Sequence, residues 1–196
     1  MFSFQRPTAQ EIEARIASVA LRPQAGIQYL RLENGRAATQ IPFLFAHDLS
    51  ASVIGQGEAT LAAARFAFEQ WSMFDLGWVR VANPQARIAV GQLIAVEAKT
   101  LSLWTLNVSR ILEVIDTPHS FGFLYSPTEL HVEEGEERFM LEFDPESQGV
   151  AYRVEAVSRP RSPLARLGLP ITRMFQHHFA RDSHRRMRET VLHCPK

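Results

Sequence analysis

Hydrophobic and polar residues alternate through the middle of the chain, and this pattern predicts six consecutive β-strands. Side chains of a strand point to opposite faces in turn, so hydrophobic residues at every second position mark a strand with one buried face. Asn83-Pro84 and Ser126-Pro127 supply turns, and the short connections favour an antiparallel meander. The predicted strands are residues 77–82, 88–98, 102–115, 121–125, 129–143 and 150–156.

Two of these strands carry polar residues on a face that is otherwise hydrophobic. In residues 102–115 the even positions are hydrophobic and include Trp104, so Arg110 is predicted to face the interior. In residues 129–143 the hydrophobic residues change from even to odd positions around Gly135, which favours a β-bulge there, with a hairpin turn as the alternative. The bulge directs Glu137 to the interior.

The N-terminal region is predicted to add a short helix and little else. Thr8 and Glu11 form a capping box before an amphipathic stretch that ends near Ala20. Residues 27–32 are a possible strand, a turn follows at Asn34-Gly35, and a loop continues through Pro42.

Helical spacing marks two further segments. A strand at residues 50–55 leads through Gly57 into an alanine-rich helix that extends to about Phe74. After the strands, Ser162 caps a turn that stops at Gly168, and a long last helix begins at Pro170.

The order of these elements predicts an α+β fold in two parts. Residues 1–48 form a helical extension packed on the domain, and residues 49–196 form the domain itself. One curved antiparallel sheet of seven strands would wrap around the long C-terminal helix and enclose a core or a cavity.

Composition and charge narrow the classes of partner. The chain has 196 residues, 46% of them hydrophobic and 21% charged, and its formal net charge is zero. A neutral chain offers no general electrostatic attraction for nucleic acid or an anionic membrane. A single cysteine, Cys194, no leader sequence and no long hydrophobic run fit a cytoplasmic protein without a transmembrane segment.

The Gly55-Gln56-Gly57 turn superficially resembles a dinucleotide-binding loop. Thr60 occupies the third glycine position, and an antiparallel meander follows instead of the parallel βαβ unit that such a site needs. We therefore predict no nucleotide binding there and no cofactor.

Several short sequences resemble the bacterial and plant family described as domain of unknown function nineteen-ninety. The resemblance runs from about Ser50 to Val191. It rests on Gly55-x-Gly57-Glu58, Gly77-Trp78-Val79-Arg80-Val81, Leu103-Trp104-x-Leu106-Asn107, Ser109-Arg110-Ile111, His131-Val132-Glu133-Glu134-Gly135-Glu136-Glu137-Arg138-Phe139, Ser158-Arg159-Pro160 and Phe179-Ala180-Arg181-Asp182-Ser183.

The resemblance implies the helix-grip fold of the START and birch-pollen-allergen superfamily. That superfamily includes lipid and hormone binders, aromatic polyketide cyclases and a few lyases, so the fold does not decide between binding and catalysis.

The candidate site consists of polar and aromatic residues on inward faces. We expect a cavity of roughly 300 Å³ or more between the sheet and the last helix. Arg110 and Glu137 would be coupled there, either around a ligand or as a structural ion pair. The residues expected to line the cavity are Gln92, Trp104, Arg110, Tyr125, Glu137 and Tyr152.

Other clusters favour ordinary structural roles. The expected bulge turns His131 and Glu133 away from Glu137, which argues against a metal site. His178 and Asp182 have helical spacing for an imidazole held by a carboxylate, although a partly exposed structural histidine is favoured. The arginine-rich face of the last helix is expected to be solvated and not to bind nucleic acid.

The predicted function is binding of a small, mainly apolar molecule in this cavity. The alternatives are a cyclase, lyase or hydrolase in the same cavity, with Glu137 or Tyr152 as acid or base, and a non-catalytic interaction module that uses the basic helix.

Overall fold

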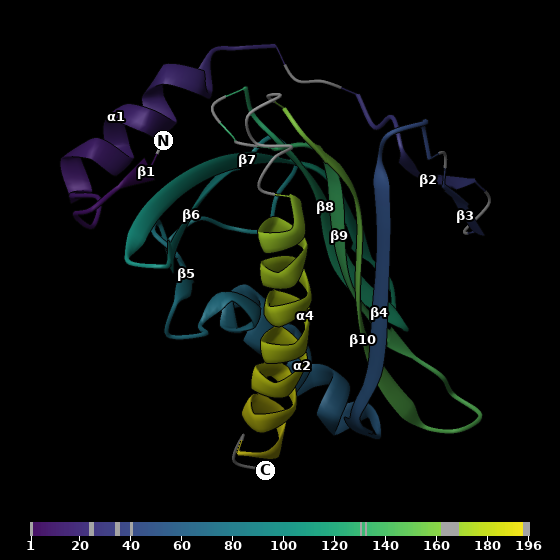
Figure 1. Cartoon of the computed structure of the whole chain (residues 1–196). Helices are drawn as coiled ribbons and strands as arrows, with labels where there is room; N and C mark the ends of the chain where they lie inside the picture. Colours follow the sequence, from purple (N-terminus) through teal and green to yellow (C-terminus); the bar gives the residue numbers. More distant parts are fainter. Residues whose placement is uncertain are drawn as a thin grey trace.

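A curved antiparallel sheet wraps around one long helix in the computed structural model, which describes residues 2–23, 26–33, 36–39, 41–129, 131, 133–161 and 169–193 (Figure 1). Within these residues seven strands follow the order β4-β10-β9-β8-β7-β6-β5, and β1 adds to β7. The strands are β1 (Phe2–Ser3), β4 (Ala46–Gln56), β5 (Val79–Val81), β6 (Leu93–Thr100), β7 (Leu103–Asp116), β8 (Ser120–Pro127), β9 (Glu133–Phe143) and β10 (Gly149–Pro160). The predicted fold class is confirmed.

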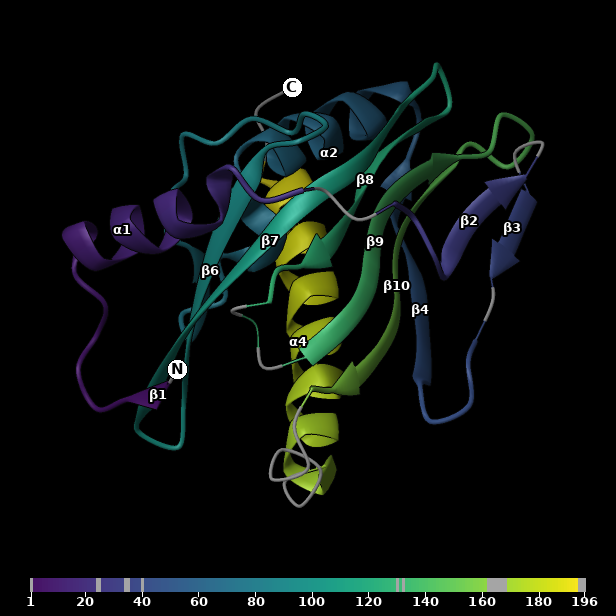
Figure 2. The ribbon, with the colours of Figure 1, turned by 90° about the horizontal axis from the view of Figure 1, so that it is seen from above.

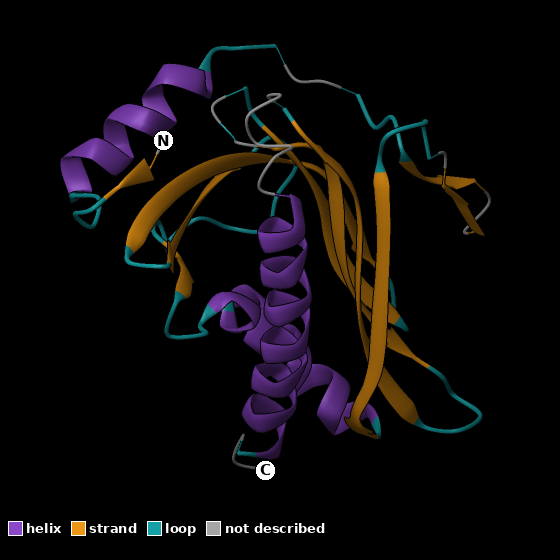
Figure 3. Ribbon diagram, viewed as in Figure 1, coloured by secondary structure: helices purple, strands orange, loops and turns teal. Residues whose placement is uncertain are grey.

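Helices fill the concave side of the sheet. The long helix α4 (Leu169–Leu192) crosses that side, with α2 (Glu58–Glu69) and the short 3-10 helix η1 (Ser72–Phe74) beside it (Figure 3). Phe68, Phe123 and Phe139 are fully buried in the core between these layers. The predicted second helix is shorter than expected, because Trp71 adopts a left-handed conformation with φ 57° and turns the chain into η1.

The N-terminal extension covers part of the convex side. The helix α1 (Ala9–Ala20) has the predicted capping box and lies on the other side of the sheet from α4 (Figure 2). Its buried Ile12 and Val19 share a cluster with strand residues Leu93, Ala95, Leu106 and Val108. The sheet therefore buries side chains on both of its faces.

A small hairpin completes the convex layer. The strands β2 (Leu30–Glu33) and β3 (Arg36–Thr39) pair with each other, so residues predicted as a loop before Pro42 form a strand. The Glu136 carboxylate accepts hydrogen bonds from the backbone N–H groups of Gln28, Tyr29 and Leu30, which holds this segment against the sheet.

The predicted bulge at Gly135 is wrong. The pairing of β9 with β10 keeps one register from Glu133 to Phe143. Gly135 has φ 145°, and a Cβ atom there would lie 2.0 Å from the carbonyl oxygen of Val157, so the glycine permits a close approach of two strands. The turn at Asn34-Gly35, the cap at Ser162, the stop at Gly168, and Leu130, Val132 and Cys194 lie outside the described residues.

The register shift that matters lies in β7. Its pairing with β8 shifts between Ile111 and Glu113. Before this shift the even residues Leu106 and Val108 pack in the convex cluster, while Ile111 and Val114 belong to the concave core. The predicted inward phase of residues 102–115 is therefore wrong for most of the strand.

Candidate functional site

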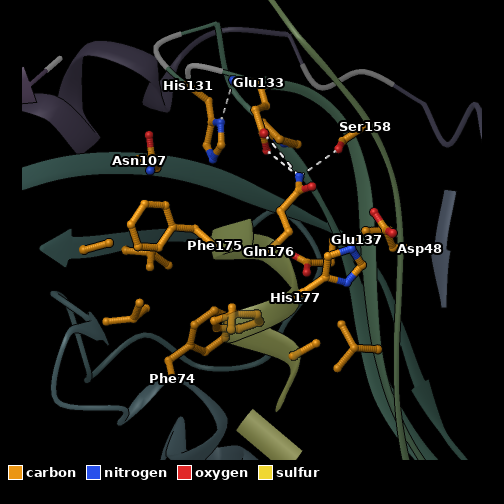
Figure 4. A pocket seen from close by; sticks show the side chains of 18 of the residues that line it. Asp48, Phe74, Asn107, His131, Glu133, Glu137, Ser158, Phe175, Gln176 and His177 are labelled. Atoms are coloured by element: carbon orange, nitrogen blue, oxygen red, sulfur yellow. Dashed lines mark hydrogen bonds between the residues drawn. The ribbon is translucent and has the colours of Figure 1, made fainter. Parts of the chain in front are cut away.

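A pocket of about 350 Å³ lies between the concave face of the sheet and the part of α4 around residues 175–180 (Figure 4). Each strand from β4 to β10 contributes residues to its wall, as do Phe74, Trp78 and His131 in the connections. The helix α4 contributes residues 175–177, 179 and 180. The size reaches the lower end for sites that bind small molecules.

The inner part of the pocket is hydrophobic. Phe74 and Phe179 have ring centroids 5.5 Å apart, and Trp78 and Phe175 are 6.0 Å apart. Val96 on β6 and Val154 on β10 add aliphatic surface. This part of the pocket favours an apolar group, because desolvation of both surfaces is favourable.

Glu137 and Tyr125 form a polar pair on the sheet wall. They are direct partners across β8 and β9, and the Tyr125 hydroxyl donates a hydrogen bond to Glu137 Oε2. Burial raises the pKa of Glu137 to about 7; the Tyr125 hydrogen bond lowers it, and the Glu133 and Asp48 charges raise it. Burial and the neighbouring carboxylate raise the pKa of Tyr125 well above its ordinary value. Glu137 is thus able to exchange a proton near neutral pH.

A second polar group is centred on Glu133, two positions before Gly135. Gln176 Nε2 on α4 donates to Glu133 Oε1 at 3.2 Å and to Ser158 Oγ at 3.3 Å (Figure 4). Burial raises the pKa of Glu133. The backbone N–H of Glu133 donates to His131 Nδ1 at 3.0 Å, and burial lowers the pKa of His131 to about 4. His131 is therefore neutral near pH 7, with its proton on Nε2.

His131 and Glu133 were missed by the sequence prediction. The expected bulge placed them opposite Glu137, whereas both line the same pocket. Alternation without a bulge would have predicted the correct face, because the odd-numbered residues 131, 133 and 137 share one face of an uninterrupted strand.

Asp48 and Asn107 stand on the remaining sides of the pocket. Arg173 Nη2 donates to Asp48 Oδ1 at 2.9 Å, and a second guanidinium nitrogen binds the other oxygen, so this carboxylate is neutralised. The Oδ1 atom of Asn107 is buried and has no hydrogen-bond partner within the described part of the chain. A buried acceptor that lacks a partner favours a ligand that supplies a donor.

Only part of the predicted residue set lies at this pocket. Tyr125 and Glu137 line it. Tyr152 is fully buried in the core instead, where its hydroxyl lies 2.7 Å from Ser183 Oγ. Gln92 donates to the Leu93 carbonyl and borders a separate groove beside α1.

Arg110 and Trp104 lie on the convex side, so their predicted inward orientation is wrong. Arg110 Nη2 donates to the Val19 carbonyl at the end of α1 at 2.7 Å. The Arg6 guanidinium lies 5.4 Å from the centroid of the Trp104 ring. The predicted coupling of Arg110 to Glu137 is wrong as well, because the sheet separates them.

Within the described residues no group of three or more His, Cys, Asp or Glu side chains is arranged to hold a metal ion. Over the same part of the chain, every helix is too short or too polar to cross a membrane.

His178 Nε2 lies 2.8 Å from Asp182 Oδ2, and the Trp78 indole donates a hydrogen bond to the same oxygen at 3.1 Å. These contacts fix one wall of the pocket to α4.

Comparison with known sequences identifies relatives over most of the chain. The family described as Domain of unknown function (DUF1990) matches residues 31–186. A UPF0548 protein of Dictyostelium discoideum is 34% identical over 149 residues, which cover 70% of this chain and 69% of that protein. A UPF0548 protein of Arabidopsis thaliana is 26% identical over 137 residues, which cover 67% of this chain and 66% of that protein.

Comparison with solved structures shows the fold. The di-domain ARO/CYC BexL from the BE-7585A biosynthetic pathway superimposes with a TM-score of 0.54. It is 13% identical, and the match covers 79% of this chain and 52% of that chain. A second di-domain ARO/CYC, StfQ from the steffimycin biosynthetic pathway, has a TM-score of 0.51 at 12% identity, over 76% of this chain and 51% of that one.

Proposed function

We propose that this chain, which belongs to the family described as Domain of unknown function (DUF1990), binds a small and mainly apolar molecule between its sheet and α4. The observation that carries the proposal is the pocket of about 350 Å³ with an aromatic inner part and a polar pair on one wall. A largely apolar pocket with a few converging polar groups is the usual form of a small-molecule site.

The apolar part supplies affinity and the polar pair supplies orientation. Phe74, Phe175 and Phe179 offer a surface for a ring or an alkyl chain. Glu137 and Tyr125 are held in place by their own hydrogen bond and by a regular register of β8 with β9. If a ligand binds with its polar end towards Glu137, the Glu137 carboxyl group contacts that polar end and not the apolar part of the ligand.

Native mass spectrometry of the freshly purified chain tests this proposal. We expect a retained small molecule, or saturable binding of the neutral fluorescent probe N-phenyl-1-naphthylamine. Ala156→Phe should abolish both, because Ala156 lines the pocket next to Glu137. Ala51→Phe is the matched control, since Ala51 is an exposed position on the neighbouring β4.

Two results would contradict the proposal. One is a folded protein that retains nothing and does not bind the probe. The other is probe binding that Ala156→Phe leaves unchanged while the variant keeps its secondary structure, which would place the binding elsewhere.

An acid–base enzyme in the same pocket is the second candidate. The observation that favours it is the pKa of about 7 on Glu137, which suits a group that takes up and releases a proton near neutral pH. The fold shared with BexL does not decide between the two functions. Chemical conversion of the retained molecule by the wild type, with binding but no conversion in Glu137→Gln, would favour the enzyme.

A further inference from the structure

The polar side of the pocket carries more negative than positive charge. Glu133 and Glu137 both line it, and within the described residues neither forms an ion pair. The charge of Arg173 lowers the pKa of Glu133, and both terminal nitrogens of this arginine bind Asp48. A buried carboxylate without a cation is costly, so the site favours a ligand that brings positive charge.

Most hydrogen-bond donors around this space are already engaged. The Tyr125 hydroxyl is bound to Glu137, the Gln176 amide to Glu133 and Ser158, and the Trp78 indole to Asp182. The imidazoles of His131 and His177 and the amide of Asn107 remain, and His131 is neutral near pH 7. Within the described residues no side chain forms an ion pair with either carboxyl group, so protons or a ligand are left to neutralise them.

The aromatic walls are compatible with a cation. Tyr125, Trp78 and Phe175 all line the pocket, and the negative face of an aromatic ring attracts a cation within about 6 Å. Asn107 Oδ1 adds a buried acceptor without a described partner. Acceptors, carboxyl groups and rings thus surround the same space, and none of the described residues that line it is a lysine or an arginine.

We propose that the pocket selects apolar molecules that carry a basic nitrogen, with the protonated nitrogen bound at Glu137 and its charge balanced further by Glu133. This inference rests on the proposed binding function and names the class of ligand. The nitrogen would replace the proton that Glu137 holds in the empty pocket, so binding below neutral pH releases that proton to solvent.

Three probes of equal shape test the choice of ligand class. They are 4-phenylbutylamine, 4-phenyl-1-butanol and 4-phenylbutyrate, which share a phenylalkyl body of similar length and carry a cationic, a neutral and an anionic head group. Calorimetry of the full chain at pH 8 should give a dissociation constant for the amine at least about tenfold lower than for the alcohol, and the carboxylate should bind most weakly.

Proton release provides a readout that hydrophobic binding alone would not give. At about pH 6 the amine should release close to one proton, measured from the heats in buffers of different ionisation enthalpy, and at about pH 8.5 close to none. The groups that face Glu137 are Tyr125 on β8, Glu133 on β9, Asp48 with Arg173 on β4 and α4, and His131 and His177 beside the pocket.

Variants identify the responsible carboxyl group. Glu137→Gln should weaken amine binding about tenfold or more, weaken alcohol binding much less and abolish proton release. Glu133→Gln should weaken amine binding less and retain proton release. Glu142→Gln is the matched control, because Glu142 lies on the same strand with an exposed ion pair to Arg153.

The outcomes separate this inference from the proposed function. If the alcohol binds as tightly as the amine and Ala156→Phe removes both, the pocket binds ligands but the proposed class is wrong. Amine binding that Glu137→Gln does not alter also contradicts the class. If no probe binds and the chain retains nothing, both the proposed function and this inference fail.

Discussion

Glu137 is the residue that links the pocket to pH. Its pKa is raised by burial to about 7, whereas a solvated glutamate titrates near 4.5. The folded chain therefore holds a proton on Glu137 over a range in which the unfolded chain has lost it. This group adds stability below about pH 4.5, and the contribution is lost as the pH rises through 7.

We expect Glu137→Gln to become more stable relative to the wild type as the pH rises. A neutral amide does not have to ionise in a buried place, so the difference in unfolding free energy should move in favour of the variant by about 2–3 kcal/mol between pH 5 and pH 8. Urea unfolding at the two pH values measures this difference. Glu142→Gln controls for the loss of a carboxylate from β9, and a pH-independent difference for Glu137→Gln would contradict the assignment.

The face of the sheet on which a residue lies was predicted correctly only where the alternation of its strand was interpreted correctly. Glu137 and Tyr125 lie on runs with a clear two-residue period, and both line the pocket. Glu133 and His131 were assigned to the wrong face because two hydrophobic residues beside them suggested a slip. Asn107 was missed because its neighbours Leu106 and Val108 are the buried ones, on the opposite face.

At the scale of the element, Gly135 sets how closely β9 and β10 approach. Its φ of 145° is strained for any residue with a side chain, and an added Cβ would lie 2.0 Å from a backbone oxygen. We expect Gly135→Ala to destabilise the chain by at least about 2–3 kcal/mol in denaturant unfolding. Gly26→Ala is the control, because nothing lies within 4 Å of its added Cβ, and it should be neutral or slightly stabilising.

If Gly135→Ala and the wild type have the same midpoint of denaturant unfolding, β10 must be free to move away from β9 at this point. The pocket wall formed by Glu137 and Ala156, which are direct partners across these strands, would then be adjustable.

The strand β7 shows why alternation alone predicted the wrong face. A period of two gives the two sets of residues that share a face, but it identifies the core side only when the other side is polar. In β7 the hydrophobic set packs under α1, and the polar set, with Thr105 and Asn107, faces the pocket. Arg110 follows the hydrophobic set to the convex side, where it binds the end of α1.

At the scale of the whole molecule, the sheet separates two packed layers. The concave layer holds the core and the pocket, and the convex layer holds α1 and the β2–β3 hairpin. The family match begins at residue 31, so α1 lies before the part of the chain that it covers. The element order predicted the concave layer correctly, whereas the convex layer could not be derived because nothing in the pattern indicated which strands α1 would cover.

The predicted division into residues 1–48 and 49–196 raises the question of whether the two parts unfold together. Ile12 and Val19 are 8% and 1% exposed against β6 and β7, and Arg110 binds the carbonyl of Val19. If the extension and the sheet form one cooperative unit, Ile12→Ala should lower the unfolding free energy of the whole chain by about 2–4 kcal/mol. Leu21→Ala, at a position 99% exposed, should change it by less than about 0.5 kcal/mol.

Calorimetry together with circular dichroism distinguishes one unit from two. A single transition that moves to lower temperature in Ile12→Ala means that packing on the convex face supports the sheet that forms the pocket. If the main transition stays in place while a small helical signal is lost earlier, α1 detaches by itself, and residues 49–196 hold the pocket without it. Because Ile12 packs in the convex cluster, the first result would show that stabilisation passes through the sheet to the opposite face.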